Sequence, residues 1–173
     1  NRQSNRLTPM TRPARIMIGV LAAALFLAGL ARAETPAIFA ALDGAWAAEG
    51  KAFGADARSF MTWTPVLGGK FFRVDYRIEM TRADGVAAFE GVGHYQIESA
   101  ETARGFWADS SGDLHPIAAA ISPDAIVSNW GAAGGKQGRT EYRLKDGGVL
   151  VTDWILTPEG WKQFNQATFR KAD

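Results

Sequence analysis

The stretch Phe71-Phe72-Arg73-Val74-Asp75-Tyr76-Arg77-Ile78-Glu79-Met80 decides the fold class. From Phe72 to Met80, apolar residues alternate with charged ones at a period of two. Successive side chains of a β-strand point to opposite faces, so this pattern predicts a strand with one buried face and one face in water. Strands of this kind are typical of antiparallel sheets, because those sheets often pack one face on the core and leave the other solvated.

Turn-forming residues divide the rest of the chain into short runs on both sides of this strand. They occur at residues 54–57, 68–69, 84–85, 100–101, 111–112, 123–124, 134–135, 146–148 and 158–160. Nine turns predict ten strands, and their spacing is typical of hairpin-linked strands. An open sheet would expose two unpaired edges, whereas closure removes both. We therefore predict an all-β fold, an antiparallel up-and-down β-barrel of about ten strands.

Two local features refine this prediction. Residues 35–42 are expected to form one short helix, with Thr35 as its cap, immediately before the first strand. Gly91 and Gly93 lie two positions apart inside a predicted strand. Glycine in a strand interior often marks a bulge or a sharp bend, so we expect the sheet to curl at this point.

The N-terminal segment has the pattern of a secretory signal. Arg12 and Arg15 precede the apolar run 16–30, and Ala31-Arg32-Ala33 supplies an A-x-A cleavage site. The apolar run is shorter than the roughly 20 residues that span a bilayer, so we expect cleavage rather than a permanent membrane anchor.

This reading divides the chain into two parts. Residues 1–33 are predicted to comprise upstream residues and a cleaved signal peptide, with Met10 favoured as the true start. Residues 34–173 are predicted to form a single barrel domain. The protein is therefore expected in the periplasm or outside a bacterial cell.

Composition narrows the classes of function. Five of the 19 basic residues lie in the predicted leader, which leaves 14 basic residues against 18 acidic ones. Nucleic-acid binding requires clustered Lys and Arg, and the longest such run in the predicted mature chain is Arg170-Lys171, so we exclude a nucleic-acid partner. The sequence contains no cysteine, which excludes disulfides, thiolate metal sites and a cysteine nucleophile.

Three segments resemble a known family. Residues 44–50 (GAWAAEG) resemble the G-x-W opening of calycin barrels. Residues 63–72 (WTPVLGGKFF) and 106–110 (FWADS) are similar to the corresponding segments of a bacterial domain-of-unknown-function family of calycin-like barrels. Calycins include lipocalins, fatty-acid-binding proteins and nitrobindin-like proteins. The resemblance implies a barrel that captures a small molecule in its interior. It also implies that Trp46 closes the barrel and that a basic residue of the last strand, Arg170, crosses its ring.

The predicted interior is rich in aromatic side chains. All three tyrosines fall on the apolar faces of their strands, and three tryptophans accompany them in the pattern. The predicted ligand-facing residues are Tyr76, Tyr95, Trp107, Trp130, Tyr142 and Trp154. Aromatic walls with a few polar groups are typical of small-molecule pockets, although the same rings can also fill a barrel completely.

The remaining residue types with catalytic or metal-binding potential form no convincing site. His94 is expected to point to solvent, and His115 lies beside Pro116 with Asp113 as its nearest acidic neighbour. Residues 109–115 contain Asp, Ser and His, but a tight turn explains them better than a hydrolase triad, whose members come from distant segments. We predict no metal site, no catalytic residues and no enzyme activity.

Three functions are compatible with these observations. The first is an exported barrel that binds a small apolar or amphipathic ligand. The second is a non-catalytic structural or interaction protein of the cell envelope with a filled barrel. The third is a haem-binding barrel, although the single proximal histidine by which nitrobindin-like proteins hold haem matches no position here. No other cofactor is expected.

Overall fold

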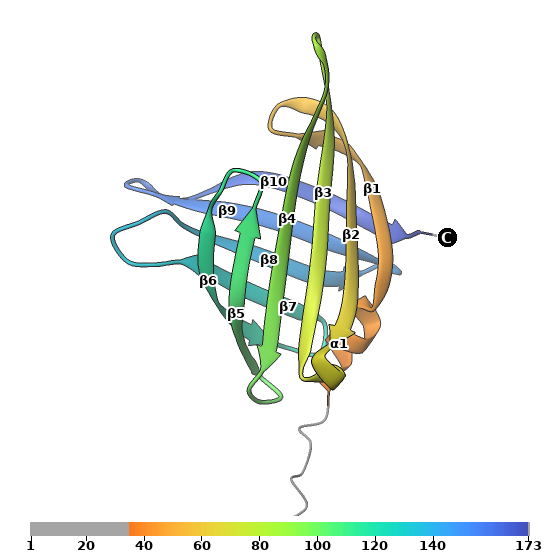
Figure 1. Cartoon of the computed structure of the whole chain (residues 1–173), viewed down its shortest axis with the longest axis vertical. Helices are drawn as coiled ribbons and strands as arrows, with labels where there is room; N and C mark the ends of the chain where they lie inside the picture. Colours follow the sequence, from red (N-terminus) through yellow and green to blue (C-terminus); the bar gives the residue numbers. More distant parts are fainter. Residues whose placement is uncertain (1–34, 173) are drawn as a thin grey trace, which may run out of the picture. The chain divides into compact units, whose positions relative to one another are not determined.

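Ten strands and one short α-helix make up the part of the chain that the structure, a computed structural model, describes, residues 35–172 (Figure 1). The predicted leader, residues 1–33, lies outside the described residues. Helix α1 (Ala37–Leu42) comes first, and a 3-10 turn, η1 (Leu67–Gly69), joins the second strand to the third. The strands are β1 (Gly44–Ala52), β2 (Ala55–Val66), β3 (Phe71–Arg82), β4 (Gly85–Ile97), β5 (Thr102–Asp109), β6 (Leu114–Ile121), β7 (Ala125–Gly131), β8 (Gln137–Lys145), β9 (Gly148–Thr157) and β10 (Gly160–Lys171).

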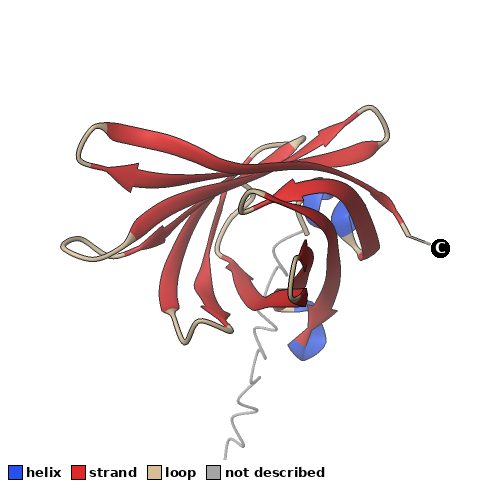
Figure 2. Ribbon diagram, turned by 90° about the horizontal axis from the view of Figure 1, so that it is seen from above, coloured by secondary structure: helices blue, strands red, loops and turns tan. Residues whose placement is uncertain are grey.

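The strands form one closed barrel in which every neighbouring pair is antiparallel. Each strand pairs with its neighbours in sequence, and β1 pairs with β10 to complete the circle. Seen from above, the strands curve around a common interior (Figure 2). The predicted all-β up-and-down barrel of ten strands is therefore confirmed. Each of the nine predicted turns overlaps a connection between strands, although the first extends over residues 55–57, which belong to β2.

The closure between β1 and β10 is short. Two residue pairs are in register there, Trp46 with Lys171 and Ala47 with Arg170, whereas β1 and β2 pair along nine positions. The ammonium of Lys171 lies over the Trp46 ring, 4.4 Å from its centroid, and donates to the Asp43 carbonyl. The prediction that Arg170 crosses this ring is wrong, because the register places Lys171 opposite Trp46. The Arg170 guanidinium instead donates to the Asp146 carbonyl at 2.5 Å.

Replacing Lys171 with methionine is expected to lower the free energy of unfolding by about 1 kcal/mol, because it removes a cation–π contact and a hydrogen bond from a short closure. Lys145→Met removes the same charge from an exposed strand end and is expected to change stability by less than about 0.5 kcal/mol. Urea unfolding followed by tryptophan fluorescence measures both variants. Equal effects would show that the Lys171 contact does not stabilise the closure.

Helix α1 packs one end of the barrel shut. Its buried side chains are Ile38, Phe39 and Leu42, and the Phe39 ring lies 4.8 Å from Phe72 and 5.9 Å from Trp63, between centroids. The predicted Thr35 cap is absent: Pro36 occupies the cap position, and no side chain caps the helix. Among the described residues, the structure contains no helix of sufficient length and apolar character to cross a membrane.

Of the bulge or sharp bend expected at Gly91 and Gly93, the bulge is absent. Strand β4 stays in register with both neighbours through these two residues, and the irregularity lies in β10, between Gln163 and Asn165. Gly91 has a different role. A Cβ atom there would lie 2.0 Å from the Trp107 ring, so the glycine provides the space in which this ring lies against the wall.

Candidate ligand chamber

The barrel is hollow at the end opposite α1. A cavity of about 470 Å³ lies between the strands and reaches the turns β1–β2, β5–β6 and β7–β8, which contribute Phe53, Ser111 and Lys136 to its wall. Up-and-down topology brings these turns to the same end of the barrel. The volume falls within the range of about 300 to 1,000 Å³ that is usual for small-molecule sites. We call this cavity the chamber.

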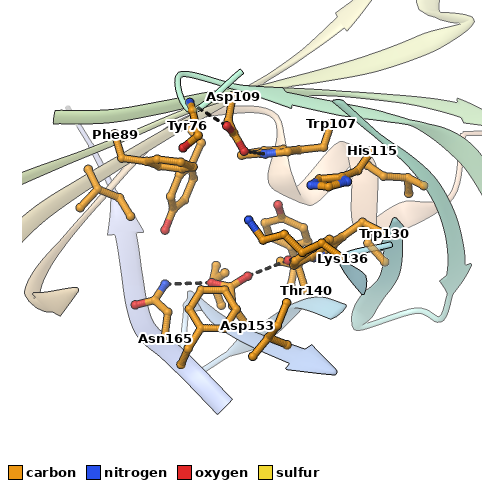
Figure 3. A pocket seen from close by; sticks show the side chains of 18 of the residues that line it. Tyr76, Phe89, Trp107, Asp109, His115, Trp130, Lys136, Thr140, Asp153 and Asn165 are labelled. Carbon is orange, nitrogen blue, oxygen red and sulfur yellow. Dashed lines mark hydrogen bonds between the residues drawn. The ribbon is translucent and has the colours of Figure 1, made fainter. Parts of the chain in front are cut away.

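Five of the six predicted ligand-facing residues line the chamber. They are Tyr76, Tyr95, Trp107, Trp130 and Tyr142, which come from strands β3, β4, β5, β7 and β8. Figure 3 shows several of these rings around the same space. The period-two alternation of the strands accounts for this arrangement, because each of these rings lies on the inward face of its strand.

Trp154 is the exception, and the prediction for it is wrong. The cross-strand partners of Trp154 are Arg139 and Gln163. The preceding residue, Asp153, pairs with Thr140 and Asn165. Asp153, Thr140 and Asn165 all line the chamber. Directly paired residues share a face of the sheet. Trp154 therefore lies on the outer face, and Asp153 is the inward residue.

Asp153 is the chamber's central polar group. Its carboxylate accepts hydrogen bonds from the Thr140 hydroxyl at 2.6 Å and from the Asn165 amide at 2.8 Å (Figure 3). The side chain is partly buried in the barrel interior, and it lines the space of the chamber. This desolvation raises the pKa of Asp153, and the two hydrogen bonds only partly oppose the shift.

Two tyrosine hydroxyls differ in their partners. The Tyr95 hydroxyl shares a hydrogen bond of 2.9 Å with Ser128, and burial raises the pKa of Tyr95 to about 12. The Tyr76 hydroxyl is buried but has no hydrogen-bond partner of normal geometry, although Asn165 and Ser59 lie close enough to favour its ionised form slightly. Burial and the nearby charge of Asp153 together raise the pKa of Tyr76.

The rim of the chamber carries a group of charged and polar residues. The Lys136 ammonium donates to Asp113 at 2.9 Å, and this contact lowers the pKa of Asp113. His115 lies in the wall beside Trp130, with a distance of 5.1 Å between ring centroids, and its Nε2 atom is 3.6 Å from the Asp113 carboxylate. This Nε2 atom is buried and has no hydrogen-bond partner.

The turn between β5 and β6 has the local geometry that its sequence predicts. Asp109 accepts hydrogen bonds from the Trp107 indole at 3.1 Å and from the Ser111 backbone at 2.9 Å, so its carboxylate holds the turn. His115 makes no hydrogen bond to a serine in the part of the chain that the structure describes. The Asp, Ser and His of this segment are therefore not arranged as a triad.

His94 lies on the outer face, as its alternation with Tyr95 predicts, but it is partly covered. Its ring stacks on Phe106 with a centroid distance of 4.9 Å, and burial together with the Arg73 charge lowers its pKa. The outward direction is therefore as predicted, but the Phe106 ring leaves the imidazole only partly exposed. Among the described residues, no group of three or more His, Asp or Glu side chains is placed to hold a metal ion.

The residues that the sequence analysis missed are Asp153, Thr140 and Asn165. A signal for Asp153 was present: it lies on the same strand face as Val149, Val151 and Ile155, so it is a carboxylate at an apolar position. Asn165 gave no comparable signal, because the irregularity before it in β10 shifts the alternation of that strand.

The fold and the chamber together define a hollow ten-stranded antiparallel β-barrel. No family model and no curated protein matches the sequence. Among solved structures, the chain is similar to the one titled "Crystal Structure of Rv2717c from M. tuberculosis", with a TM-score of 0.58 and 15% sequence identity. The match covers 80% of this chain and 99% of that chain. At this identity, the likeness shows a shared fold alone.

Proposed function

We propose that this protein is an exported, non-catalytic barrel that binds a small, largely apolar molecule with one polar end. The observation that carries the proposal is the chamber: a cavity of about 470 Å³ whose wall is aromatic and aliphatic except for a small set of polar groups. Pockets for small molecules are built in this way, with apolar walls for affinity and a few polar groups for orientation. The calycin-like resemblance of the sequence and its leader pattern support the same proposal.

The chamber also separates this proposal from its alternatives. A structural protein with a filled barrel gains nothing from an internal cavity, because each unfilled volume weakens packing. A haem-binding barrel is the second candidate, and one observation favours it: the His115 Nε2 atom of the chamber wall has no hydrogen-bond partner of normal geometry, although the Asp113 carboxylate lies 3.6 Å away. A neutral imidazole nitrogen is a common ligand of haem iron.

Native mass spectrometry of the protein, expressed in a bacterium from residues 1–173, tests the proposal. We expect a population of the protein to carry a bound small molecule, and we expect a lipid, pigment or amine panel to raise the melting temperature. The intact mass reports the N-terminus, and a chain that begins at Glu34 supports export. An absorbance scan distinguishes haem. A chain without any bound molecule, and without a thermal shift across the panel, would contradict the proposal.

A cavity-filling variant shows whether binding occurs in the chamber. Ile155 lines the chamber, and the next residue, Leu156, faces outward with 41% of its surface exposed. Ile155→Trp is expected to reduce binding at least about tenfold by occupying the ligand's volume, whereas Leu156→Trp is expected to leave it unchanged. Circular dichroism checks that both variants fold. Equal binding by the two variants would place the ligand outside the chamber.

A further inference from the structure

The charge deep in the chamber is negative. Asp153 lies on the inward face of β9 between β8 and β10, and its carboxylate faces the open space. Among the described residues that line the chamber, the one lysine or arginine is Lys136, which lies at the exposed rim and is already paired with Asp113. An anionic ligand would therefore meet an unpaired negative charge at the centre of the chamber, at a high cost in a desolvated site.

The hydrogen-bonding capacity of Asp153 is only partly used. An ionised carboxylate has about four lone-pair positions, and Thr140 and Asn165 donate one hydrogen bond each. The Tyr76 hydroxyl lies in the same wall and is buried, and it has no hydrogen-bond partner of normal geometry, although Asn165 and Ser59 lie close to it. Figure 3 shows Tyr76, Asp153 and Asn165 around one region of the chamber. Buried polar groups are normally satisfied, so free acceptors at this position are suited to a donor that enters with a ligand.

The walls around this polar group are suited to a cation. Rings of Tyr76, Trp107, Trp130 and Tyr142 line the same chamber as Asp153. Aromatic faces attract cations, most strongly where water is excluded. A partly buried carboxylate in a chamber lined by aromatic rings provides both a counter-ion and a favourable environment for an ammonium group and its apolar substituents.

Resting on the proposed function, we infer that the ligand of the chamber is an apolar amine, whose protonated nitrogen pairs with the Asp153 carboxylate and donates to the Tyr76 hydroxyl. The apolar part of the amine then lies along the aromatic and aliphatic wall toward the rim. The chamber discriminates against fatty acids and other apolar carboxylates, because Asp153 repels them and no unpaired cation lies inside to receive them.

Four decyl probes with different polar ends test this inference on the unmodified protein. The probes are decylamine, decyltrimethylammonium, decanol and decanoate, and isothermal titration calorimetry at pH 7 measures their binding. Decylamine is expected to bind most tightly and decanoate at least about tenfold more weakly. Decyltrimethylammonium carries the charge without an N–H group, so it is expected to fall between these two.

Two variants assign the contacts. Asp153→Asn keeps the shape of the side chain but removes its charge, and it is expected to weaken decylamine binding at least about tenfold while decanol binding changes by less than about twofold. Tyr76→Phe removes one hydroxyl and is expected to weaken decylamine but not decyltrimethylammonium. Asp84→Asn, in the exposed β3–β4 turn, removes the same charge outside the chamber and is expected to have no effect.

The outcomes separate the two proposals. Decanoate or decanol binding as tightly as decylamine, or an unchanged decylamine affinity in Asp153→Asn, would overturn the amine inference while leaving a binding chamber. A co-purified ligand without a basic nitrogen would do the same. If none of the four probes binds and no molecule co-purifies, both the inference and the proposed function fail.

Discussion

Gly138→Ala is expected to lower the free energy of unfolding by about 3 kcal/mol, because the wall of the chamber has no space for even one methyl group there. A Cβ atom at Gly138 would lie 1.9 Å from the Trp130 ring. The ring is held in place by its indole hydrogen bond to the Thr140 hydroxyl at 3.3 Å and by its contact with His115. The methyl group must therefore displace either a strand or a packed tryptophan.

A glycine in the neighbouring loop gives a matched control. A Cβ atom at Gly135 has its nearest neighbour at 3.5 Å, so Gly135→Ala is expected to change stability by less than about 0.5 kcal/mol. A double-mutant cycle identifies the cause of the larger effect. In a Trp130→Ala background, Gly138→Ala is expected to be close to neutral, because the ring that it displaces is gone. A cost that persists without the ring would show that the backbone, and not Trp130, requires glycine.

Gly138 also affects the candidate site through a chain of contacts. Trp130 donates to the Thr140 hydroxyl, and that hydroxyl donates to the Asp153 carboxylate. A displaced Trp130 ring therefore changes the position of a group that holds the carboxylate in place. Gly91 in β4 and Trp107 in β5 form an equivalent pair. A Cβ atom added at Gly91 would lie 2.0 Å from the Trp107 ring. Two glycines thus let two tryptophans lie flat along the wall and leave the chamber open.

Much of the fold could be predicted from the sequence because one face of most strands is apolar. The alternation from Phe72 to Met80 appears in the structure as a strand whose buried residues include Phe72, Val74 and Tyr76. The turns could be predicted because glycine and aspartate occupy positions with few conformational alternatives. Gly134 and Gly147, for example, have φ values of 80° and 72°, which other residues rarely adopt.

The features that could not be predicted depend on register. Whether Arg170 or Lys171 meets Trp46 is decided by the pairing of β1 with β10, and the two residues differ by a single position. A shift of one residue exchanges the two faces of a strand. The same property explains Trp154: it follows Asp153 directly in β9, so a shift of one position decides which of the two side chains faces the chamber.

Asp153→Asn is expected to stabilise the protein at neutral pH by about 0.5 to 2 kcal/mol, in the range of other substitutions that relieve a functional constraint. Burial raises the pKa of Asp153 above its unfolded value of about 3.8. Below the unfolded value the carboxyl is neutral in both the folded and the unfolded protein, so the folded protein carries no cost of a buried charge. As the pH rises from this unfolded value to the raised pKa, the unfolded state gives up its proton while the folded state keeps it, so stability is lost across this interval. The asparagine variant has no such loss.

The pH dependence distinguishes this explanation from a general effect of charge. The difference in melting temperature between Asp153→Asn and the unmodified protein is expected to be smallest near pH 4 and to grow toward pH 7. The tyrosines on which the charge of Asp153 acts, Tyr76, Tyr95 and Tyr142, all have raised pKa values and stay neutral over this range. Asp84→Asn, whose side chain is exposed, is expected to show no such trend.

A less stable Asp153→Asn variant at neutral pH would mean that the hydrogen bonds from Thr140 and Asn165 repay the burial of the charge, so that Asp153 serves the fold. A more stable variant that has also lost its affinity for decylamine would mean that Asp153 serves ligand binding and lowers the stability of the fold. A carboxylate that weakens the empty barrel is retained for what it contacts, and a cation at that position removes the cost that burial imposes. Ligand binding and the pH dependence of stability would then have the same physical origin.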